Sequence, residues 1–337
     1  MRSLVAATAA AAVLVACSSA TPTPHAGPTS TSGAPAPTTP VPPTTPVPPT
    51  TSTTAAPRPT TTVPPPPPHP APITATTWIA VPGDGVWAPA GRSVEAAPAV
   101  YTTTLHHFGL PVAVAWMDTA RLRVALYAGT SQPTGTWPND GAVPRPLWGS
   151  LVAAMNSGFQ LDQSMGGWYL DGAAATPLRP GAASLVVYRN GSATVGQWGR
   201  DVTLTPAVLA VRQNLSLLID GAAPTLAVAT SNPIGVWGDP LHENVLTWRS
   251  ALGVDGAGHL LYVAGPGMNP PTLAGAMVAA GARRAMELDI NPEWVSFDTF
   301  EGTGTATVGQ KLLSSMYFPT YHFLTPFWRD FVAVFAR

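Results

Sequence analysis

Two carboxylates spaced two residues apart, Glu287 and Asp289, are the side chains of this 337-residue chain best suited to acid–base chemistry. They alternate with Met286, Leu288 and Ile290, which is the pattern of a β-strand whose apolar residues face a core. The two carboxylates then share the opposite face, with Cα atoms about 6.8 Å apart. Carboxylates on such a strand need an arginine, a metal or a substrate as partner, unless the face is exposed and solvated.

Other polar side chains with a chemical use lie near strand ends or inside strands. Asn291 and Trp294 follow directly after the expected strand and supply an amide and an aromatic surface for substrate. Arg249 lies inside the expected strand 245–254, where its partner should be a carboxylate or a phosphate. A structural ion pair and ligand binding are both open for it. Asn156 follows a small apolar stretch, where it either binds a sugar hydroxyl or caps a turn.

The composition excludes several functional classes. With 16 basic and 17 acidic residues, the formal net charge is −1, which gives no electrostatic reason to bind nucleic acid or an anionic membrane surface. A single cysteine forms no internal disulfide and no cysteine-rich zinc site. Lys311 is the one lysine, which argues against a lysine-based phosphate loop. No cofactor is predicted, and a divalent metal held by Asp289 and Glu287 is left open.

The first 17 residues have the pattern of an export signal. Arg2 is followed by a mostly apolar run, Leu4–Ala16, which is too short to span a membrane. The segment Leu14–Cys17 resembles the lipobox of bacterial lipoproteins, and this resemblance implies that Cys17 becomes an acylated N-terminus. Acylation would anchor the chain to the outer face of the bacterial cell membrane. The alternative is an ordinary signal peptide with an incidental cysteine.

Residues 18–75 are expected to form a disordered linker. Between residues 21 and 72, 35 of 52 residues are proline or threonine, so this segment has almost nothing apolar to bury. Proline favours the extended polyproline II conformation, about 3.1 Å per residue, which suits a stalk. A ligand for a partner that binds Pro-x-x-Pro is the alternative. The remaining residues, 76–337, are expected to form one globular domain.

The strand signals of this domain fall in antiparallel pairs joined by short turns. Four hairpins are predicted: Val112–Met117 with Leu122–Tyr127, Ser184–Tyr188 closed by Asn190-Gly191, Leu215–Ile219 closed by Asp220-Gly221, and Val245–Val254 with His259–Ala264. An Asn-Gly pair favours a type I′ turn, which needs positive φ angles at both central residues.

One segment has clear helix signals. Thr272–Gly281 is predicted to be a helix that Thr272 caps and Gly281 ends. The segment Leu147–Met155 fits either a helix or a strand. Antiparallel hairpins combined with few helices predict an α+β fold, with mixed, mainly antiparallel β-sheets and a few packed helices.

Three segments, taken in order, resemble the phosphodiester glycosidase family. They are Ala154–Phe159, Arg249–Asp255 with Gly258, and Leu273–Asp289, and the resemblance spans roughly residues 100–335. It implies an α+β domain that hydrolyses the bond between the anomeric carbon of a sugar and a phosphodiester.

The same resemblance implies roles for particular residues. Arg249 would lie near the phosphate with Ser250 beside it, and Asn156 and Asp289 would belong to the catalytic site. Glu287 is the second candidate for the catalytic carboxylate. The family usually continues Leu-Asp with a glycine-rich run that ends in serine, whereas this chain continues with Ile290–Trp294. This difference indicates either a branch with another substrate or a domain that binds without turnover.

The sequence as a whole predicts a surface-anchored hydrolase that cleaves a glycosyl phosphodiester in an envelope or extracellular glycan. Its partners would be a carbohydrate or glycosyl-phosphate substrate and, through Cys17, a membrane. The alternative is a non-catalytic glycan-binding lipoprotein, for which the 11 tryptophans supply surfaces that stack on sugars. If the hydrolase prediction is right, Asn156, Arg249 and Asp289 should converge in one cleft.

Overall fold

The structure, a computed structural model, describes residues 69–230, 233–239 and 244–337. The predicted export signal, with Cys17, and nearly all of the predicted linker lie outside the described residues. The described residues all belong to one compact unit. Ile73 is buried in a hydrophobic core of this unit, and its backbone N–H donates to the carbonyl of Gly85. The packed chain therefore already includes residues that precede the predicted domain start at residue 76.

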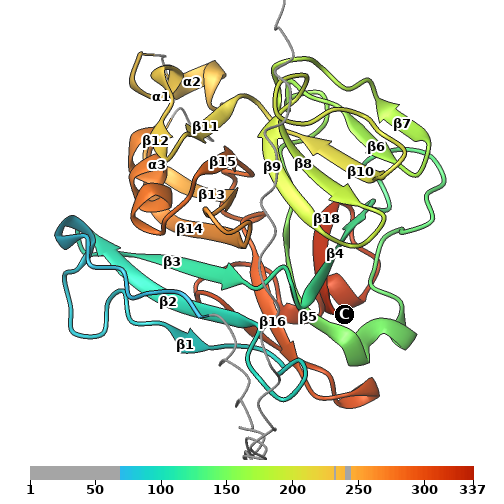
Figure 1. Ribbon diagram of the computed structural model, residues 1–337, viewed down its shortest axis with the longest axis horizontal. Coiled ribbons are helices and arrows are strands. Elements are labelled where there is room, and N and C mark those ends of the chain that lie inside the picture. The colour runs from blue at the N-terminus through green and yellow to red at the C-terminus, as the bar shows by residue number, and fades with distance from the viewer. Residues whose placement is uncertain (1–68, 231–232, 240–243) are drawn as a thin grey trace, which may run out of the picture. The chain divides into compact units, whose positions relative to one another are not determined.

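Three antiparallel β-sheets form the framework of the described chain (Figure 1). The eight-stranded sheet has the order β1 (Ala88–Pro89), β2 (Val100–His107), β3 (Leu110–Met117), β14 (Leu260–Met268), β13 (Thr247–Val254), β15 (Arg284–Glu287), β11 (Leu217–Asp220), β12 (Ala223–Pro224). One five-stranded sheet has the order β7 (Ala173–Thr176), β6 (Trp168–Leu170), β10 (Val208–Gln213), β8 (Ala183–Tyr188), β9 (Ala193–Gln197). The other has the order β17 (Val308–Lys311), β16 (Phe297–Glu301), β5 (Leu151–Asn156), β18 (Phe331–Ala336), β4 (Leu122–Tyr127).

Helices are few and short in the described ranges. The three α-helices are α1 (Leu226–Thr230), α2 (Pro233–Val236) and α3 (Pro270–Ala279). Short 3-10 turns occupy Thr76–Trp78, Arg145–Ser150, Gly304–Ala306 and Thr320–Leu324. The prediction of mainly antiparallel sheets with a few helices is therefore confirmed in this coarser form, and the fold is richer in β-structure than the term α+β implies.

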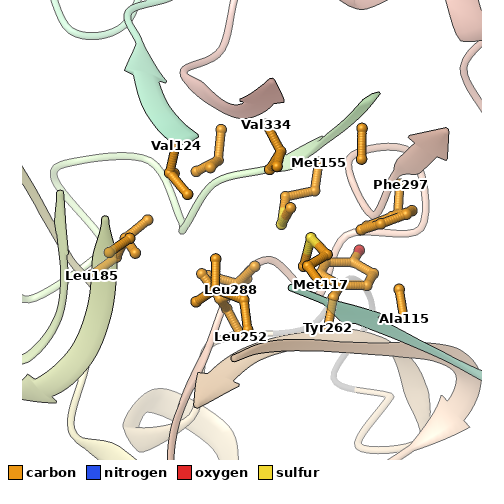
Figure 2. Close-up of a cluster of buried hydrophobic side chains, with 14 of the residues drawn as sticks. Ala115, Met117, Val124, Met155, Leu185, Leu252, Tyr262, Leu288, Phe297 and Val334 are labelled. Carbon is orange, nitrogen blue, oxygen red and sulfur yellow. The ribbon is translucent and has the colours of Figure 1, made fainter. Parts of the chain in front are cut away.

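The largest hydrophobic core lies where side chains of all three sheets meet (Figure 2). Met117 of β3, Leu185 of β8 and Val334 of β18 are all fully buried in it. A second core, which includes Val263 of β14 and Met277 of α3, covers the opposite face of the eight-stranded sheet. Burying an apolar side chain of this size stabilises the fold by about 1.5–3 kcal/mol. The central strands are thus packed on both faces and form a rigid support for the segments at their ends.

Three of the four predicted hairpins are present, and one is wrong. The pairs β8–β9, β11–β12 and β13–β14 form as expected. The segment 118–121, however, does not close a hairpin, because β3 pairs with β2 and β14 while β4 pairs with β18 in another sheet. The β8–β9 turn is also not type I′, since Gly191 has a φ of 82° and Asn190 is not among the residues with positive φ.

The predicted helix is present, with a different N-cap. Asn269 caps α3 through its side-chain oxygen, which accepts from the backbone N–H of Thr272 at 2.9 Å. Gly281 follows the C-cap with a φ of 92°, as a helix-ending glycine should. The ambiguous segment Leu147–Met155 divides into a 3-10 turn and strand β5.

Candidate functional site

A cleft of about 430 Å³ opens where five segments of the chain come together, one of them at Leu215 between β10 and β11. It is lined by Phe159 and the residues after β5, by Gly238 and Asp239 before β13, by Asp289 to Trp294 after β15, and by Arg329 before β18. Volumes of 300–1,000 Å³ are typical of small-molecule sites. Because the lining combines apolar side chains with carboxylates, amides and an arginine, this cleft is the candidate active site.

Asp289 lies two residues beyond the end of β15 and is 4% exposed. Its Oδ2 accepts a hydrogen bond from Arg329 Nη2 at 3.0 Å, and its Oδ1 accepts from the backbone N–H of Asn291 at 2.9 Å. Burial raises the pKa of Asp289 above its ordinary value, although Arg329 and the Asn291 N–H favour the charged form. A carboxyl group with a raised pKa in a cleft is suited to proton transfer.

Arg329 is the partner of Asp289, and it was not among the residues predicted for the site. Its Nη2 also donates to the carbonyl of Gly158 at 2.9 Å, and its guanidinium carbon lies 4.9 Å from the ring centroid of Trp294. The guanidinium is therefore held between a carboxylate, a carbonyl and an aromatic face. Two features of the sequence point to Arg329. Charged residues are scarce in this chain, and Arg329 lies just before the last apolar strand.

Arg249 and Glu287 form a fully buried ion pair. Arg249 Nη1 lies 2.6 Å from Glu287 Oε1, and both side chains are 0% exposed. Arg249 also donates to the carbonyls of Met268 and Trp237, at 3.0 Å each. Burial raises the pKa of Glu287 above its ordinary value, and the adjacent guanidinium opposes this shift. Neither residue lines the cleft, so the structure gives Arg249 a carboxylate partner rather than a place in the cleft wall.

Asn156, at the end of β5, and Ser250, in β13, form a hydrogen-bonded link to the backbone of Asp289. Asn156 Nδ2 donates to Ser250 Oγ at 3.1 Å, and Ser250 Oγ donates to the backbone carbonyl of Asp289 at 2.8 Å. Asn156 Oδ1 accepts from the hydroxyl of Tyr262 at 2.7 Å and from the backbone N–H of Ser296 at 3.1 Å. Asn156 and Asp289 therefore do come together, and the network fixes the backbone position of Asp289.

A narrow inner pocket adjoins the cleft. Asp289, Trp294 and Arg329 line both hollows, while Asn156 and Ser157 line only the inner one. Its wall is completed by Gly158, Ser296, Phe323, Phe327, Asp330 and Phe331. Asp289 and Arg329 thus lie between the open cleft and a hollow deeper in the protein.

The predicted arrangement of the strand around Asp289 is partly wrong. Met286 and Leu288 belong to the largest core, as expected, but Ile290 belongs to the second core on the other face. The cause is that β15 ends at Glu287, so the strict alternation of sides stops before Ile290. Asn291 and Trp294 both lie in the cleft lining.

The described residues contain no cluster of side chains suited to bind a metal ion. Across residues 69–230, 233–239 and 244–337, no three histidine, cysteine, aspartate or glutamate side chains are grouped as a metal site requires. Glu287 and Asp289 each have an arginine as ionic partner instead.

In the same part of the chain, no helix has the length and apolar character needed to cross a membrane.

Comparisons with known proteins give similarity at the level of structure alone. No protein-family model and no curated protein matches the chain. Among solved structures, it is similar to the catalytic domain of zebrafish N-acetylglucosamine-1-phosphodiester alpha-N-acetylglucosaminidase, auto-inhibited by its pro-peptide. The identity is 12% and the TM-score 0.46, over 74% of this chain and 87% of the zebrafish one.

Two other solved structures show weaker similarity. A hypothetical protein from Synechocystis has 13% identity and a TM-score of 0.39, over 74% of this chain and 64% of its own. A protein from Burkholderia pseudomallei described as exported has 13% identity and a TM-score of 0.34, over 72% of this chain and 75% of its own. At these identities and TM-scores, the similarity assigns no activity to this chain.

Proposed function

We propose that the chain is a hydrolase that cleaves the bond between a sugar and a phosphodiester, with Asp289 as general base and Arg329 as the phosphate-binding cation. The observation that carries this proposal is the buried Asp289–Arg329 pair in the wall of a cleft that also presents Trp294. The sequence resemblance to phosphodiester glycosidases points to the same chemistry. The predicted phosphate-binding role of Arg249 passes to Arg329 in this proposal, because Arg249 is paired with Glu287 outside the cleft lining.

In the proposed reaction, Asp289 and Arg329 act on the water and on the leaving group. Water attacks the anomeric carbon while Asp289 accepts one of its protons. The bond from that carbon to the phosphodiester oxygen breaks, and the oxygen leaves with the electron pair as part of a phosphate monoester. Arg329 stabilises the growing charge on this leaving group. Asn156 and Ser250 hold Asp289 through its backbone, and Arg249 with Glu287 supports the neighbouring strands.

The location of the chain is part of the proposal. An export signal over residues 1–17, acylation at Cys17 and a stalk between Cys17 and the packed domain would place the domain at the outer face of the cell membrane. This part is supported by the lipobox-like segment Leu14–Cys17 and by the proline and threonine content of the linker.

The direct test is an assay of the full chain, purified in detergent, on a glycosyl phosphodiester and on a neutral aryl glycoside of the same sugar. Release of free sugar from the phosphodiester is the expected result. If neither substrate releases sugar although the chain binds them by calorimetry, the hydrolase proposal is wrong.

Arg329→Lys should lower kcat/KM for the phosphodiester by roughly tenfold and leave the neutral glycoside within about twofold. Lysine keeps the positive charge but lacks the planar fork that holds two oxygens at once, so about one charge-assisted hydrogen bond is lost. Arg145→Lys is the matched control, since Arg145 is exposed and its guanidinium carbon lies 5.9 Å from the Trp148 ring centroid. Equal losses on both substrates would contradict the phosphate-binding role of Arg329.

A second candidate function, glycan binding without turnover, is favoured by a group of aromatic side chains next to the cleft. We call Trp294, Tyr317, Phe318, Phe327 and Trp328 the aromatic rim. The ring centroids of Phe318, Phe327 and Trp328 lie 5.4, 5.7 and 5.9 Å from that of Trp294. Tyr317 and Trp328 are 63% and 60% exposed. Exposed aromatic rings that continue from a cleft offer sugars a stacking surface.

Trp328→Ala should weaken the binding of a soluble cell-wall oligosaccharide by roughly two- to tenfold, because one stacking surface is lost. Isothermal titration calorimetry measures this effect. Phe108→Ala is the control, since Phe108 is 94% exposed at the turn between β2 and β3 and is not part of the aromatic rim. Equal affinities for the two variants would count against the rim as a sugar-binding surface.

A further inference from the structure

Three buried polar atoms around the inner pocket have no hydrogen-bond partner among the described residues. They are Ser157 Oγ, Arg329 Nε and Asp330 Oδ1, and all three residues line the inner pocket. Buried polar atoms are almost always paired with protein or with ordered water, because leaving them unpaired is costly. Three such atoms in the wall of one small hollow therefore indicate that they share a ligand.

Arg329 and Asp330 each have another polar atom that is already hydrogen-bonded. Arg329 Nη2 donates to Asp289 and to the carbonyl of Gly158. Asp330 Oδ2 accepts from Arg212 Nε at 2.7 Å, in an ion pair whose two side chains are each 1% exposed. Arg329 Nε and Asp330 Oδ1 thus belong to groups that other buried bonds already hold in place, and they cannot turn to seek partners without breaking those bonds.

The chemistry and size of the inner pocket limit its occupant. Arg329 Nε offers a donor, Asp330 Oδ1 offers an acceptor, and the hydroxyl of Ser157 acts as either. A cation would be repelled by the guanidinium and an anion by the carboxylate. The pocket has room for about 10 Å³, which corresponds to about one water molecule. Water satisfies both signs at once, and buried waters typically make about three hydrogen bonds.

We infer that the inner pocket binds one ordered water, which accepts from Arg329 Nε, donates to Asp330 Oδ1 and shares a hydrogen bond with Ser157 Oγ. This water completes a continuous chain of interactions that runs from Arg212 through Asp330, the water and Arg329 to Asp289. Its effect is to fix Nε of the Arg329 guanidinium, whose Nη2 binds Asp289. Ser157 and Asp330 are therefore positioning residues for Arg329, a role that rests on the proposed function.

A crystal structure of the chain, at a resolution that shows ordered waters, tests the site itself. The expected result is one water within hydrogen-bond distance of Ser157 Oγ, Arg329 Nε and Asp330 Oδ1. The inference is overturned if the three atoms pair with one another or with other side chains, or if the density has the coordination of an ion.

Kinetics of Ser157→Ala test the positioning role. Loss of one hydrogen bond to the water should lower kcat/KM for a glycosyl phosphodiester by roughly two- to tenfold and spare a neutral glycoside of the same sugar. A purely structural role would affect both substrates equally, and that result would remove the positioning role. Ser314→Ala, at an exposed serine, is the control. A chain that shows the water but releases no sugar would retain the water site and refute only the proposed function.

Discussion

Asp289→Asn should lower the rate of sugar release from a glycosyl phosphodiester by about 10²–10⁴-fold. Asparagine preserves the size of the side chain and still accepts a hydrogen bond from Arg329, but an amide does not take a proton from the attacking water. The expected loss is therefore chemical and should appear in kcat. Steady-state release of free sugar, followed at saturating substrate, measures it.

A neighbouring carboxylate provides the matched control. Glu293 follows Asp289 on the same segment and is exposed, so Glu293→Gln removes a similar charge without touching the Asp289–Arg329 pair. This control variant should keep the rate within about twofold. An Asp289→Asn protein that turns over at the unchanged rate would remove Asp289 from the mechanism.

The pH dependence of the unmodified chain gives a second readout of the same assignment. A general base works only when deprotonated, so the rate should rise with pH through the pKa of Asp289. Because burial raises that pKa, the rising limb should lie above the range near 3.9 that is ordinary for aspartate. The limb should be missing from any residual activity of Asp289→Asn.

The candidate site could be predicted from the sequence where its residues are neighbours in the chain. Asp289, Asn291 and Trp294 lie within six residues at a strand end, and the local pattern of an apolar strand followed by polar groups was enough to select them. Asn156 was selected for the same reason. Such patterns carry information because a strand end places successive side chains at one edge of a sheet.

The partners across the site could not be predicted in this way. β18 pairs with β5, so the start of β18 lies beside the end of β5. There Asn156 is linked through Ser250 to the backbone of Asp289, and Arg329 reaches the Asp289 carboxylate. Glu287 is the partner of Arg249 because β13 and β15 are neighbours in the eight-stranded sheet, with Ala251 opposite Glu287. A strand pattern shows which side a residue faces, but the order of strands in a sheet depends on packing across the whole domain.

The incorrect hairpin has the same cause. The segments that became β3 and β4 are close in sequence and joined by a short polar turn, which is the usual signature of a hairpin. Strand β3, however, is buried on both faces, with Val114 in one core and Ala115 in the other, and its neighbours on either side are β2 and β14. With both edges of β3 occupied, the chain passes to another sheet at Asp118.

The Arg249–Glu287 pair should dominate the response of stability to single substitutions near the site. Glu287→Ala leaves the Arg249 guanidinium buried without its counter-ion, and removing one partner of a buried pair costs about 3–5 kcal/mol. Chemical denaturation, with the free energy of unfolding extrapolated to water, measures the effect. The control is Asp171→Asn: its partner Arg189 is half exposed, a surface pair of this kind is worth at most about 1 kcal/mol, and asparagine tolerates the positive φ of 46° at this position.

The double variant Arg249→Met with Glu287→Leu separates the two contributions of the pair. If the cost in Glu287→Ala comes from an unpaired buried charge, replacing both partners by apolar side chains should recover much of the stability. The recovery should be incomplete, because Arg249 also donates to the carbonyls of Trp237 and Met268. Trp237 precedes Gly238 in the cleft wall, so the double variant should show a raised KM with a nearly unchanged kcat. If the Glu287→Ala protein has the same free energy of unfolding as the unmodified chain, the ion pair does not contribute to stability. Contacts other than this pair must then hold Trp237 and the cleft wall in place.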